Sequence, residues 1–554
     1  MIRKIWLSGL ALAVVALVAV AAAFAAPTRS QAGTLVFGAA SDPVSLDAAV
    51  ISDGESFRVT NQIVETLVGL KPGTTKLVPQ LATGWKKSNG GKTWTFTLRK
   101  NVRFHDGTPF NAAAVCANFD RWYNFTGALQ SSSASYYYNT VFVGFRKPEK
   151  GAKGPKDALY KSCKAINETT AQINLRYAFG PFLGALTINP FGIQSPTAMK
   201  KYGADKGRLS KDGVYVPLGT YGTPGGVSAG TGPFKVESWK VGDKLVLVRN
   251  NEYWGKKAIL DRVIVVAIAD NAARLQALQT GEIQGYDLVE PQDIKTIQRD
   301  SDLKVLDRPA FNVGYVTINQ AVEPFDNLKV RQAVAYGLDR ARVVKAFYAG
   351  RGEVAHQFMP PSVPGYSNGV PKYTYNPAKA KQLLEEAGVT LPLEVEFWYP
   401  TDVSRPYMPA PEKNFQAFAA SLNKAGFKVI PKSAPWRPDY LGRVDAGTAG
   451  ALNLIGWTGD YADADNFVGT FFRTEQSQWG FDDPKLRDVL ERALVETNLE
   501  IRGSLYRQAN NIIMRNVYGV PYVHTKPALA FAKNVRGYVA SPTTTESFAT
   551  VTVG

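Results

Sequence analysis

The sequence predicts an α/β protein, because stretches with the periodicity of strands and stretches with the periodicity of helices interleave along its whole length. The length of 554 residues exceeds what a single hydrophobic core usually supports and favours roughly two to four domains. No internal repeat and no low-complexity segment interrupts the chain. We therefore expect a multidomain globular protein rather than a repeat array or a disordered chain.

Three stretches have the pattern of strands. Residues 34–38 form an apolar run that opens the predicted fold. Residues 94–99 alternate apolar with polar side chains, and residues 244–248 do the same, so that Leu245 and Leu247 share one face.

Two stretches have the pattern of helices. Asn376 and Pro377 are a typical cap and first-turn proline, and Gly388 is a typical stop signal. Residues 327–347 carry apolar side chains at three- and four-residue spacing, which predicts one amphipathic helix. The glycine-rich stretch 219–232 predicts a long loop in the middle of the chain.

The first residues have the pattern of an export signal. Two basic residues, at positions 3 and 4, precede the apolar stretch 5–26. Ala23 and Ala25 form the small-x-small pattern of a cleavage site, which predicts a signal peptide of residues 1–25; a cut after Ala32 is the second candidate. An uncleaved membrane anchor is the alternative. No cysteine lies near the end of this stretch, so a lipoprotein is not expected.

The formal net charge of +17 falls to +15 once the predicted signal peptide is removed. The basic residues are scattered rather than gathered in runs, so no nucleic-acid partner is expected. Residues 146–164 are the richest basic stretch, and we interpret them as a solvated loop.

The chain contains two cysteines, Cys116 and Cys163. After export into an oxidising compartment, the pair is expected to form a disulfide that closes a loop of 46 intervening residues. Two buried free thiols are the alternative.

One stretch matches the pattern of a serine hydrolase, with Ser228 at the centre of the G-x-S-x-G sequence 226–230. That motif requires a sharp turn between a strand and a helix, whereas loop residues lie on both sides here. We therefore expect no catalytic residue and no enzyme activity.

Metal ligands are also not expected. The three histidines, His105, His356 and His524, occur in unrelated contexts, without the spacing of a metal site. Asp460, Asp463 and Asp465 form an acidic cluster, but it lacks the glycine and the glutamate of a calcium-binding EF-hand loop. We predict neither a metal nor a cofactor.

The chain resembles the peptide-binding family of solute receptors of bacterial ABC importers, the extracellular solute-binding proteins of family 5. The similar segments occur in the same order from about residue 34 to the C-terminus. They are residues 42–47 (DPVSLD), 79–82 (PQLA), 94–99 (WTFTLR), 104–107 (FHDG), 230–234 (GTGPF), 250–254 (NEYW with its preceding Asn) and 330–333 (VRQA).

This resemblance implies a two-lobed periplasmic-binding-protein-like fold of type II, with a hinge and an extra small sub-lobe. The first lobe is expected to comprise residues 34–270 and 525–554, with the sub-lobe inserted at about 53–182. The second lobe is expected to comprise residues 271–524. The hinge would lie at the crossovers near residues 270 and 525, and closure would enclose the ligand.

Two segments resemble the dipeptide-binding branch of the family, which implies that Arg405 binds a peptide carboxylate and Asp460 its α-ammonium. A guanidinium suits a carboxylate bidentately, and a carboxylate accepts several ammonium hydrogens. The other expected ligand-binding residues are Tyr407, Trp457, Thr458 and Gly459. Where the family usually has Asp-Pro-Asp, this chain has Asp463-Ala464-Asp465. The alternative is that Asp460 caps a turn and Arg405 forms a surface ion pair.

The function implied is an exported, monomeric receptor, in the periplasm or at the outer face of the cytoplasmic membrane. It would deliver short peptides, dipeptides foremost, to the permease subunits of an ABC importer with cytoplasmic ATPase subunits. The alternative cargoes are oligopeptides, glutathione or another non-peptide solute, because one fold carries many ligands.

Overall fold

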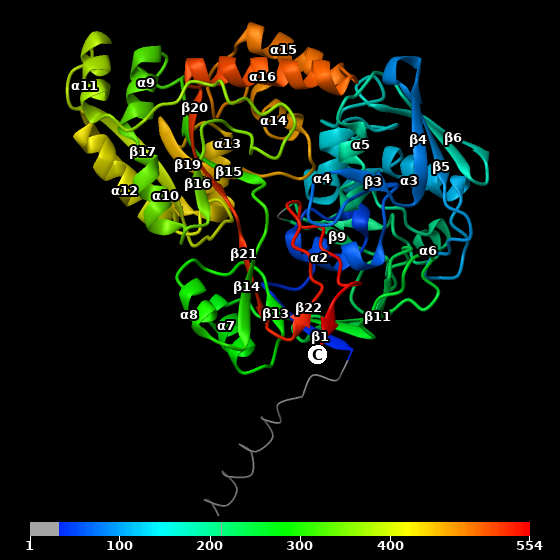
Figure 1. Cartoon of the computed structure of the whole chain (residues 1–554). Coiled ribbons are helices and arrows are strands. Elements are labelled where there is room, and N and C mark those ends of the chain that lie inside the picture. The colour runs from blue at the N-terminus through cyan, green and yellow to red at the C-terminus, as the bar shows by residue number, and fades with distance from the viewer. Residues whose placement is uncertain (1–32, 212) are drawn as a thin grey trace, which may run out of the picture.

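The computed structural model describes residues 33–211 and 213–554, and these form two lobes with a smaller sub-lobe (Figure 1). The prediction of an α/β fold is confirmed, since helices and strands alternate and pair into mixed sheets. The predicted signal peptide and both candidate cleavage positions lie outside the described residues. Within the described part of the chain, no helix combines the length and the hydrophobicity that a bilayer crossing requires.

The first lobe surrounds a seven-stranded sheet in which β1 (Thr34–Ala39) runs parallel to β12 (Arg262–Ala267) and to β13 (Gly285–Tyr286). Leu35 and Phe37 of β1 enter the core on one face of the sheet, and Val36 packs on the other. The remaining strands and the helices of this lobe are β10 (Phe234–Lys240), β11 (Lys244–Arg249), β14 (Leu303–Asp307), β21 (Ala528–Ala532), α2 (Gly54–Ile63), α7 (Asn271–Gln279) and α8 (Ile294–Arg299). The predicted strands at 34–38 and 244–248 are confirmed.

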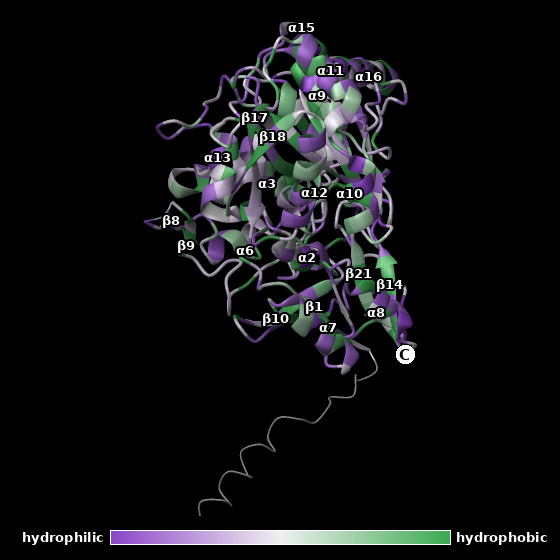
Figure 2. Cartoon of the chain, turned by 90° about the vertical axis from the view of Figure 1, so that its left-hand side faces the viewer, coloured by the Kyte–Doolittle hydropathy of each residue, from purple (hydrophilic) through white to green (hydrophobic). Residues whose placement is uncertain are grey.

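The spatial order of this sheet is β10-β11-β12-β1-β13-β21-β14. The lobe boundary expected at residue 270 is therefore wrong, because residues 271–307 supply two strands and two helices to the first lobe. β13 pairs with β1, and β21 lies between β13 and β14. β21 is almost entirely buried, and Figure 2 shows it mainly in the hydrophobic colour, whereas α8 is mainly in the hydrophilic colour.

The sub-lobe contains a four-stranded sheet with the spatial order β4-β5-β7-β6. Its strands and helices are β4 (Ala82–Ser88), β5 (Thr93–Leu98), β6 (Tyr160–Asn167), β7 (Thr170–Leu175), α3 (Ala112–Tyr123), α4 (Ser132–Val141) and α5 (Phe182–Ala185). β5 confirms the predicted strand at 94–99. The basic stretch 146–164 is only partly the predicted loop, because its last residues belong to β6.

A disulfide between Cys116 and Cys163 joins α3 to β6, and this confirms the first of the two expectations for the thiols. In the chain-entropy account, closing a loop of this length stabilises the folded state by about 4 kcal/mol. The bond therefore holds the helix of the sub-lobe against its sheet.

The second lobe is a three-layer α/β/α structure around the sheet β16-β20-β15-β19-β17-β18. Every residue of the inner strand β15 (Asn312–Ile318) is buried, with Tyr315 in the core on one face and Val316 in the core on the other. The other strands and the helices are β16 (Gly352–Val354), β17 (Leu393–Thr401), β18 (Phe427–Pro435), β19 (Leu452–Thr458), β20 (Gly519–Thr525), α9 (Leu328–Gly337), α10 (Arg340–Phe347), α11 (Pro377–Glu386), α12 (Pro411–Lys424), α13 (Leu441–Asp445), α14 (Gly469–Phe472), α15 (Pro484–Val495) and α16 (Leu499–Asn516).

The single helix predicted over residues 327–347 is two helices, α9 and α10. The side chain of Asp339 accepts a hydrogen bond from the backbone N–H of Arg342 and so caps a new helix after Leu338. The prediction for α11 is confirmed: the side chain of Asn376 caps it, and Gly388 follows its end with a φ of 74°.

Several short elements connect these layers. The small strands are β2 (Val68–Leu70), β3 (Leu77–Pro79), β8 (Gly207–Leu209), β9 (Tyr215–Pro217), β22 (Val535–Arg536) and β23 (Thr552–Val553), and they form three two-stranded ribbons. The short helical turns are α6 (Pro196–Lys201), η1 (Ala48–Val50), η2 (Asn89–Gly91), η3 (Gly127–Gln130), η4 (Asn189–Phe191), η5 (Trp436–Tyr440) and η6 (Ala464–Asn466). The predicted loop at 219–232 contains no helix or strand.

The chain crosses between the lobes twice, from β14 to β15 and from β20 to β21. The two crossovers are hydrogen-bonded to each other: the backbone N–H of Arg308 donates to the carbonyl of Pro527 at 2.8 Å. The side chain of Asn312 accepts from the backbone N–H of Thr525 at 3.0 Å and donates to its carbonyl at 3.1 Å. These paired segments connect the two lobes.

Candidate functional site

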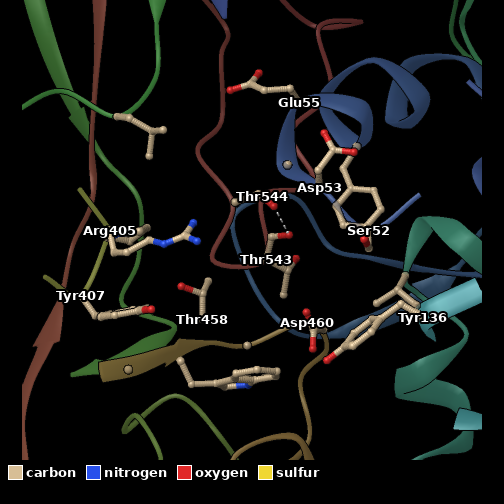
Figure 3. Close-up of a pocket in the computed structure, with 18 of the residues that line it drawn as sticks. Ser52, Asp53, Glu55, Tyr136, Arg405, Tyr407, Thr458, Asp460, Thr543 and Thr544 are labelled. Carbon is tan, nitrogen blue, oxygen red and sulfur yellow. Dashed lines mark hydrogen bonds between the residues drawn. The ribbon is translucent and has the colours of Figure 1, made fainter. Parts of the chain in front are cut away.

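A cavity of about 740 Å³ lies between the two lobes, within the size range of small-molecule sites. Residues of α2, of α4 and of the C-terminal tail line it from the first lobe and its sub-lobe. Residues that follow β17 and β19 line it from the second lobe. Figure 3 shows Arg405 and Tyr407 on one side of the cavity and Asp460 and Tyr136 on the other.

Arg405 lies in the loop after β17, where it pairs with Met408 through backbone hydrogen bonds in both directions. Its guanidinium carbon is 4.5 Å from the centre of the Trp436 ring, a cation–π contact. Among the described residues, no carboxylate forms an ion pair with it, and its buried Nε has no hydrogen-bond partner. The expected alternative, a surface ion pair, is therefore not found.

The Arg405 loop is fastened to the crossover. The hydroxyl of Thr525, the last residue of β20, donates to the carbonyl of Pro406 at 2.7 Å. Thr525 also contacts Asn312, which is in the other crossover segment. The position of Arg405 is therefore linked to the two segments that connect the lobes.

Asp460 follows β19 on the opposite side of the cavity. Its carboxylate accepts hydrogen bonds from the hydroxyl of Tyr137 at 2.8 Å and from Nδ2 of Asn466 at 3.1 Å. Burial raises the pKa of Asp460 above its ordinary value, although both hydrogen bonds oppose the shift. No Lys or Arg among the described residues forms an ion pair with it, so its charge is available to a ligand cation.

The other four predicted ligand-binding residues also line the cavity. Trp457 and Thr458 are half-buried at the end of β19, and Tyr407 is buried with its ring against Gly456. Gly459 has a packing reason to be glycine, because an added Cβ would lie 2.4 Å from the Phe311 ring and 2.5 Å from the Phe467 ring. The structure thus brings all six predicted residues to one cavity.

Asp463 and Asp465 do not join Asp460 in the cavity. Arg502 binds the Asp463 carboxylate with two nitrogens, and Arg473 forms an ion pair with Asp465. Among the described residues, no group of His, Cys, Asp and Glu has the arrangement of a metal site. Both carboxylates are therefore already paired with arginines of the protein and not with a metal or a ligand.

The sequence analysis did not identify the residues that complete the site. Tyr137 holds Asp460, and Trp436 supports Arg405. The first lobe adds Asp53 and the tail residues Thr543 to Thr545. The three consecutive tyrosines at 136–138 are the only sequence signal for any of these, and that pattern has no specific meaning without the fold.

A buried network of charges lies beside the crossovers. Arg308, which follows β14, binds Asp287 with two nitrogens at 3.0 Å and Glu546 at 2.7 Å, and Arg58 also binds Asp287, at 2.8 Å. The two guanidiniums hold the pKa of Asp287 well below its ordinary range, although burial acts in the opposite direction. This network satisfies its own charges, unlike Arg405 and Asp460.

The lobes also meet away from the crossovers. The backbone N–H of Gly180 in the sub-lobe donates to the carbonyl of Leu494 at 2.6 Å, and Nζ of Lys87 donates to the carbonyl of Thr497 at 2.8 Å. Tyr461, next to Asp460, is 3% exposed and packs in the core of the sub-lobe. We call these contacts the interlobe latch, because they hold the second lobe against the sub-lobe.

Ser228 and two of the three histidines, for which no catalytic or metal-binding role was expected, have structural partners. The hydroxyl of Ser228 donates to the carbonyl of Leu46 at 2.8 Å. The rings of His105 and His524 contact the carbonyls of Gly232 and Asn312. Burial lowers the pKa of each of the three histidines to about 4, so all three are neutral at pH 7.

A family model described as "Bacterial extracellular solute-binding proteins, family 5 Middle" matches residues 76–479. The chain is 30% identical over 539 residues to the dipeptide-binding protein of Escherichia coli (strain K12), with 94% of this chain and 95% of that protein covered. It is also 30% identical over 540 residues to heme-binding protein A of Haemophilus influenzae, with 95% and 93% covered. The solved structure of DppA from Helicobacter pylori in complex with the peptide STSA is 27% identical, with a TM-score of 0.74 and 94% and 98% covered.

Proposed function

Because this chain belongs to the bacterial extracellular solute-binding proteins of family 5, we propose that it is the exported receptor of an ABC importer for short peptides, dipeptides foremost. The observation that supports this cargo best is a pair of opposite charges, Arg405 and Asp460, that line one interlobe cavity without ion-pair partners of their own among the described residues. Each is half-buried, and each suits one end of a zwitterionic peptide.

The energetic argument follows from desolvation. Moving an ionised group out of water costs several kcal/mol unless it meets a partner of opposite charge. A peptide has one ammonium and one carboxylate, so Asp460 and Arg405 would each compensate one end. Trp457, Thr458 and Tyr407 would form the wall between the ends, and Gly459 would keep that wall close to the ligand.

The comparisons support the receptor more strongly than its cargo, because relatives of equal identity are named for dipeptides and for heme. Among the residues that line the cavity there is no histidine, methionine or cysteine, which are the axial ligands in most heme proteins. Tyrosine is the one heme ligand present in this lining, so it is the pair of opposite charges that favours a peptide over heme. Glutathione, a tripeptide with a γ-glutamyl linkage for which another relative is named, is the second candidate.

Calorimetry on the exported form of the protein tests the cargo and its length. We expect dialanine to bind, and we expect N-acetyl-dialanine and pentaalanine to bind at least tenfold more weakly. The acetyl group removes the charge that would meet Asp460. An extended chain advances about 3.3–3.6 Å per residue, so the two ends of pentaalanine would lie too far apart to meet both fixed charges. Equal affinities for dialanine and pentaalanine would refute dipeptide selection, and native mass spectrometry of the co-purifying ligand would then identify the cargo.

The interlobe latch leads to a further expected result, with Gly180→Ala. An added Cβ at this position would lie 2.4 Å from the carbonyl oxygen of Glu496 and 2.5 Å from Nε of Arg502, both in the second lobe. We expect this variant to bind dialanine about tenfold more weakly, and its dialanine complex to show a larger radius of gyration in X-ray scattering.

Gly84→Ala in the same sub-lobe is the matched control, because a Cβ there meets nothing within 4 Å. We expect it to behave as the unmodified protein in both measurements. Unchanged affinity and unchanged radius in Gly180→Ala would show that the latch contributes nothing to ligand capture.

The proposal extends to location and partners. The export signal predicted at residues 1–25 would place the receptor outside the cytoplasm, and a membrane permease would receive the peptide from it. We propose that it acts as a monomer, because one chain supplies both lobes and the whole cavity wall.

A further inference from the structure

The charge balance of the cavity is opposite to that of the whole chain. The sequence has a net charge of +17, whereas the residues that line the cavity include five carboxylates and three guanidiniums. Two of those guanidiniums, Arg58 and Arg308, belong to the internal network with Asp287. The remaining one is Arg405, which the proposed function assigns to a ligand carboxylate.

Asp53 is a carboxylate on the first-lobe wall that the proposed function does not use. One oxygen caps α2 by accepting the backbone N–H of Ser56 at 2.8 Å, and no Lys or Arg among the described residues forms an ion pair with it. Both Asp53 and Asp460 act electrostatically on Tyr137, and together with burial they raise the pKa of its phenol well above the ordinary value. Figure 3 shows Asp53, Asp460 and Tyr136 on the side of the cavity away from Arg405.

A second, independent acceptor lies on the same wall. Asn189 lines the cavity and is 6% exposed, and its Oδ1 has no hydrogen-bond partner. Its η4 segment packs against α2, the helix that Asp53 caps. A buried amide oxygen without a donor is costly, so a ligand N–H at this position would restore a lost interaction.

A relay of hydrogen bonds fixes the orientation of this amide. The carbonyl of Thr544 is able only to accept, and it accepts from Nδ2 of Asn61 at 3.3 Å. Oδ1 of Asn61 must therefore accept in turn, from Nδ2 of Asn189 at 3.1 Å. This order leaves Oδ1 of Asn189 as the acceptor. The first-lobe wall thus carries a half-exposed carboxylate, Asp53, and a buried amide oxygen, Oδ1 of Asn189, that lacks a donor.

We propose that the cavity selects peptides whose first residue carries a cationic, hydrogen-donating side chain, as lysine or arginine does, with Asp53 and Asn189 as its partners. This inference rests on the proposed function. The α-ammonium would neutralise Asp460 of the second lobe. The side-chain cation would meet Asp53, which lies in the first lobe. A lysine or arginine side chain offers three or more donors, which suits two acceptors on one wall.

Calorimetry with two matched dipeptides tests this inference on the exported form of the protein at fixed ionic strength. Lys-Ala and norleucyl-Ala have side chains of similar length and differ in charge. We expect Lys-Ala to bind at least tenfold more tightly than norleucyl-Ala. In Asp53→Asn we expect this ratio to fall to within about twofold. Asparagine caps a helix as well as aspartate does, so the substitution preserves the start of α2.

Asn189→Leu provides the second variant, and we expect it to reduce the Lys-Ala preference about threefold or more. The outcomes distinguish a preference for a basic first residue from peptide binding itself. If both dipeptides bind with equal affinity, the inference of a basic first residue is overturned and the peptide receptor stands. If neither dipeptide binds, the proposed cargo fails and this inference fails with it.

Discussion

Arg405→Ala is expected to weaken dialanine binding by a few hundred- to a few thousand-fold, since a carboxylate left unpaired in a desolvated cleft costs on the order of 3–5 kcal/mol. Nothing in the described structure replaces this guanidinium, because the other two that line the cavity already bind Asp287. Calorimetry measures the loss directly.

A double-mutant cycle separates the carboxylate contact from packing. The unmodified protein is expected to prefer dialanine over its C-terminal amide, and Arg405→Ala is expected to lose that preference. Arg405→Lys serves as the control, because it keeps the charge and loses the planar fork that stacks on Trp436. The affinity of Arg405→Lys for dialanine should lie between that of the unmodified protein and that of Arg405→Ala. A preference that persists in Arg405→Ala would mean that another residue binds the carboxylate.

Asp460→Asn is expected to abolish most dialanine binding, about a hundredfold or more, and at the same time to raise the melting temperature of the ligand-free protein. The pKa of Asp460 is raised in the folded state, so its ionisation opposes folding. Below the ordinary pKa of 3.8, the carboxyl is protonated in both states and the two proteins should be equally stable. The advantage of the variant should grow as the pH rises above 3.8 and should level off above the raised pKa.

Ligand affinity should have the opposite dependence on pH. The ammonium requires the ionised carboxylate, so the affinity of the unmodified protein should fall as the pH falls through the raised pKa of Asp460. The groups that face this carboxylate are Tyr136, Tyr137 and Asn466, with Asp53 acting on the same tyrosines from the first lobe. The variant should show little change over the same range. Equal melting temperatures combined with intact binding would contradict the role of Asp460.

The elements that the sequence predicted well are those governed by local rules. The alternation in β5 and the capping of α11 by Asn376 depend on residues within a few positions of one another. The break between α9 and α10 follows the same rules, since Asp339 is a typical cap. The apolar spacing continues across Asp339, which is why the sequence analysis predicted one helix instead of two.

The assignment of strands to sheets was not predictable in this way. β13 consists of two residues, and it belongs to the first lobe only because it pairs with β1 and β21. The boundary at residue 270 was therefore misplaced by the length of two helices and two strands.

The residues of the candidate site also fall into two groups, those that the sequence analysis predicted and those that only the fold brings together. The resemblance identified Arg405 and Asp460, but their supporting residues are determined by the fold. The contact between Tyr137 and Asp460 spans 323 positions of sequence, and it joins the sub-lobe to the second lobe. Asp53 and Asn189 acquire a role only where the first lobe faces the second across the cavity. No pattern within a single segment encodes such a wall.

The position of β21 has a consequence for how the molecule forms. This strand lies between β13 and β14, yet it belongs to the last 27 residues of the chain. The second lobe, at about 312–525, precedes this inner strand in the sequence, so the sheet of the first lobe needs a segment from beyond the second lobe to be complete. Folding of the first lobe then depends on closing a very long loop, which is intrinsically slow. The sheet of the first lobe is therefore complete only once residues 528–532 have paired with residues 303–307, which lie on the other side of the second lobe in the sequence.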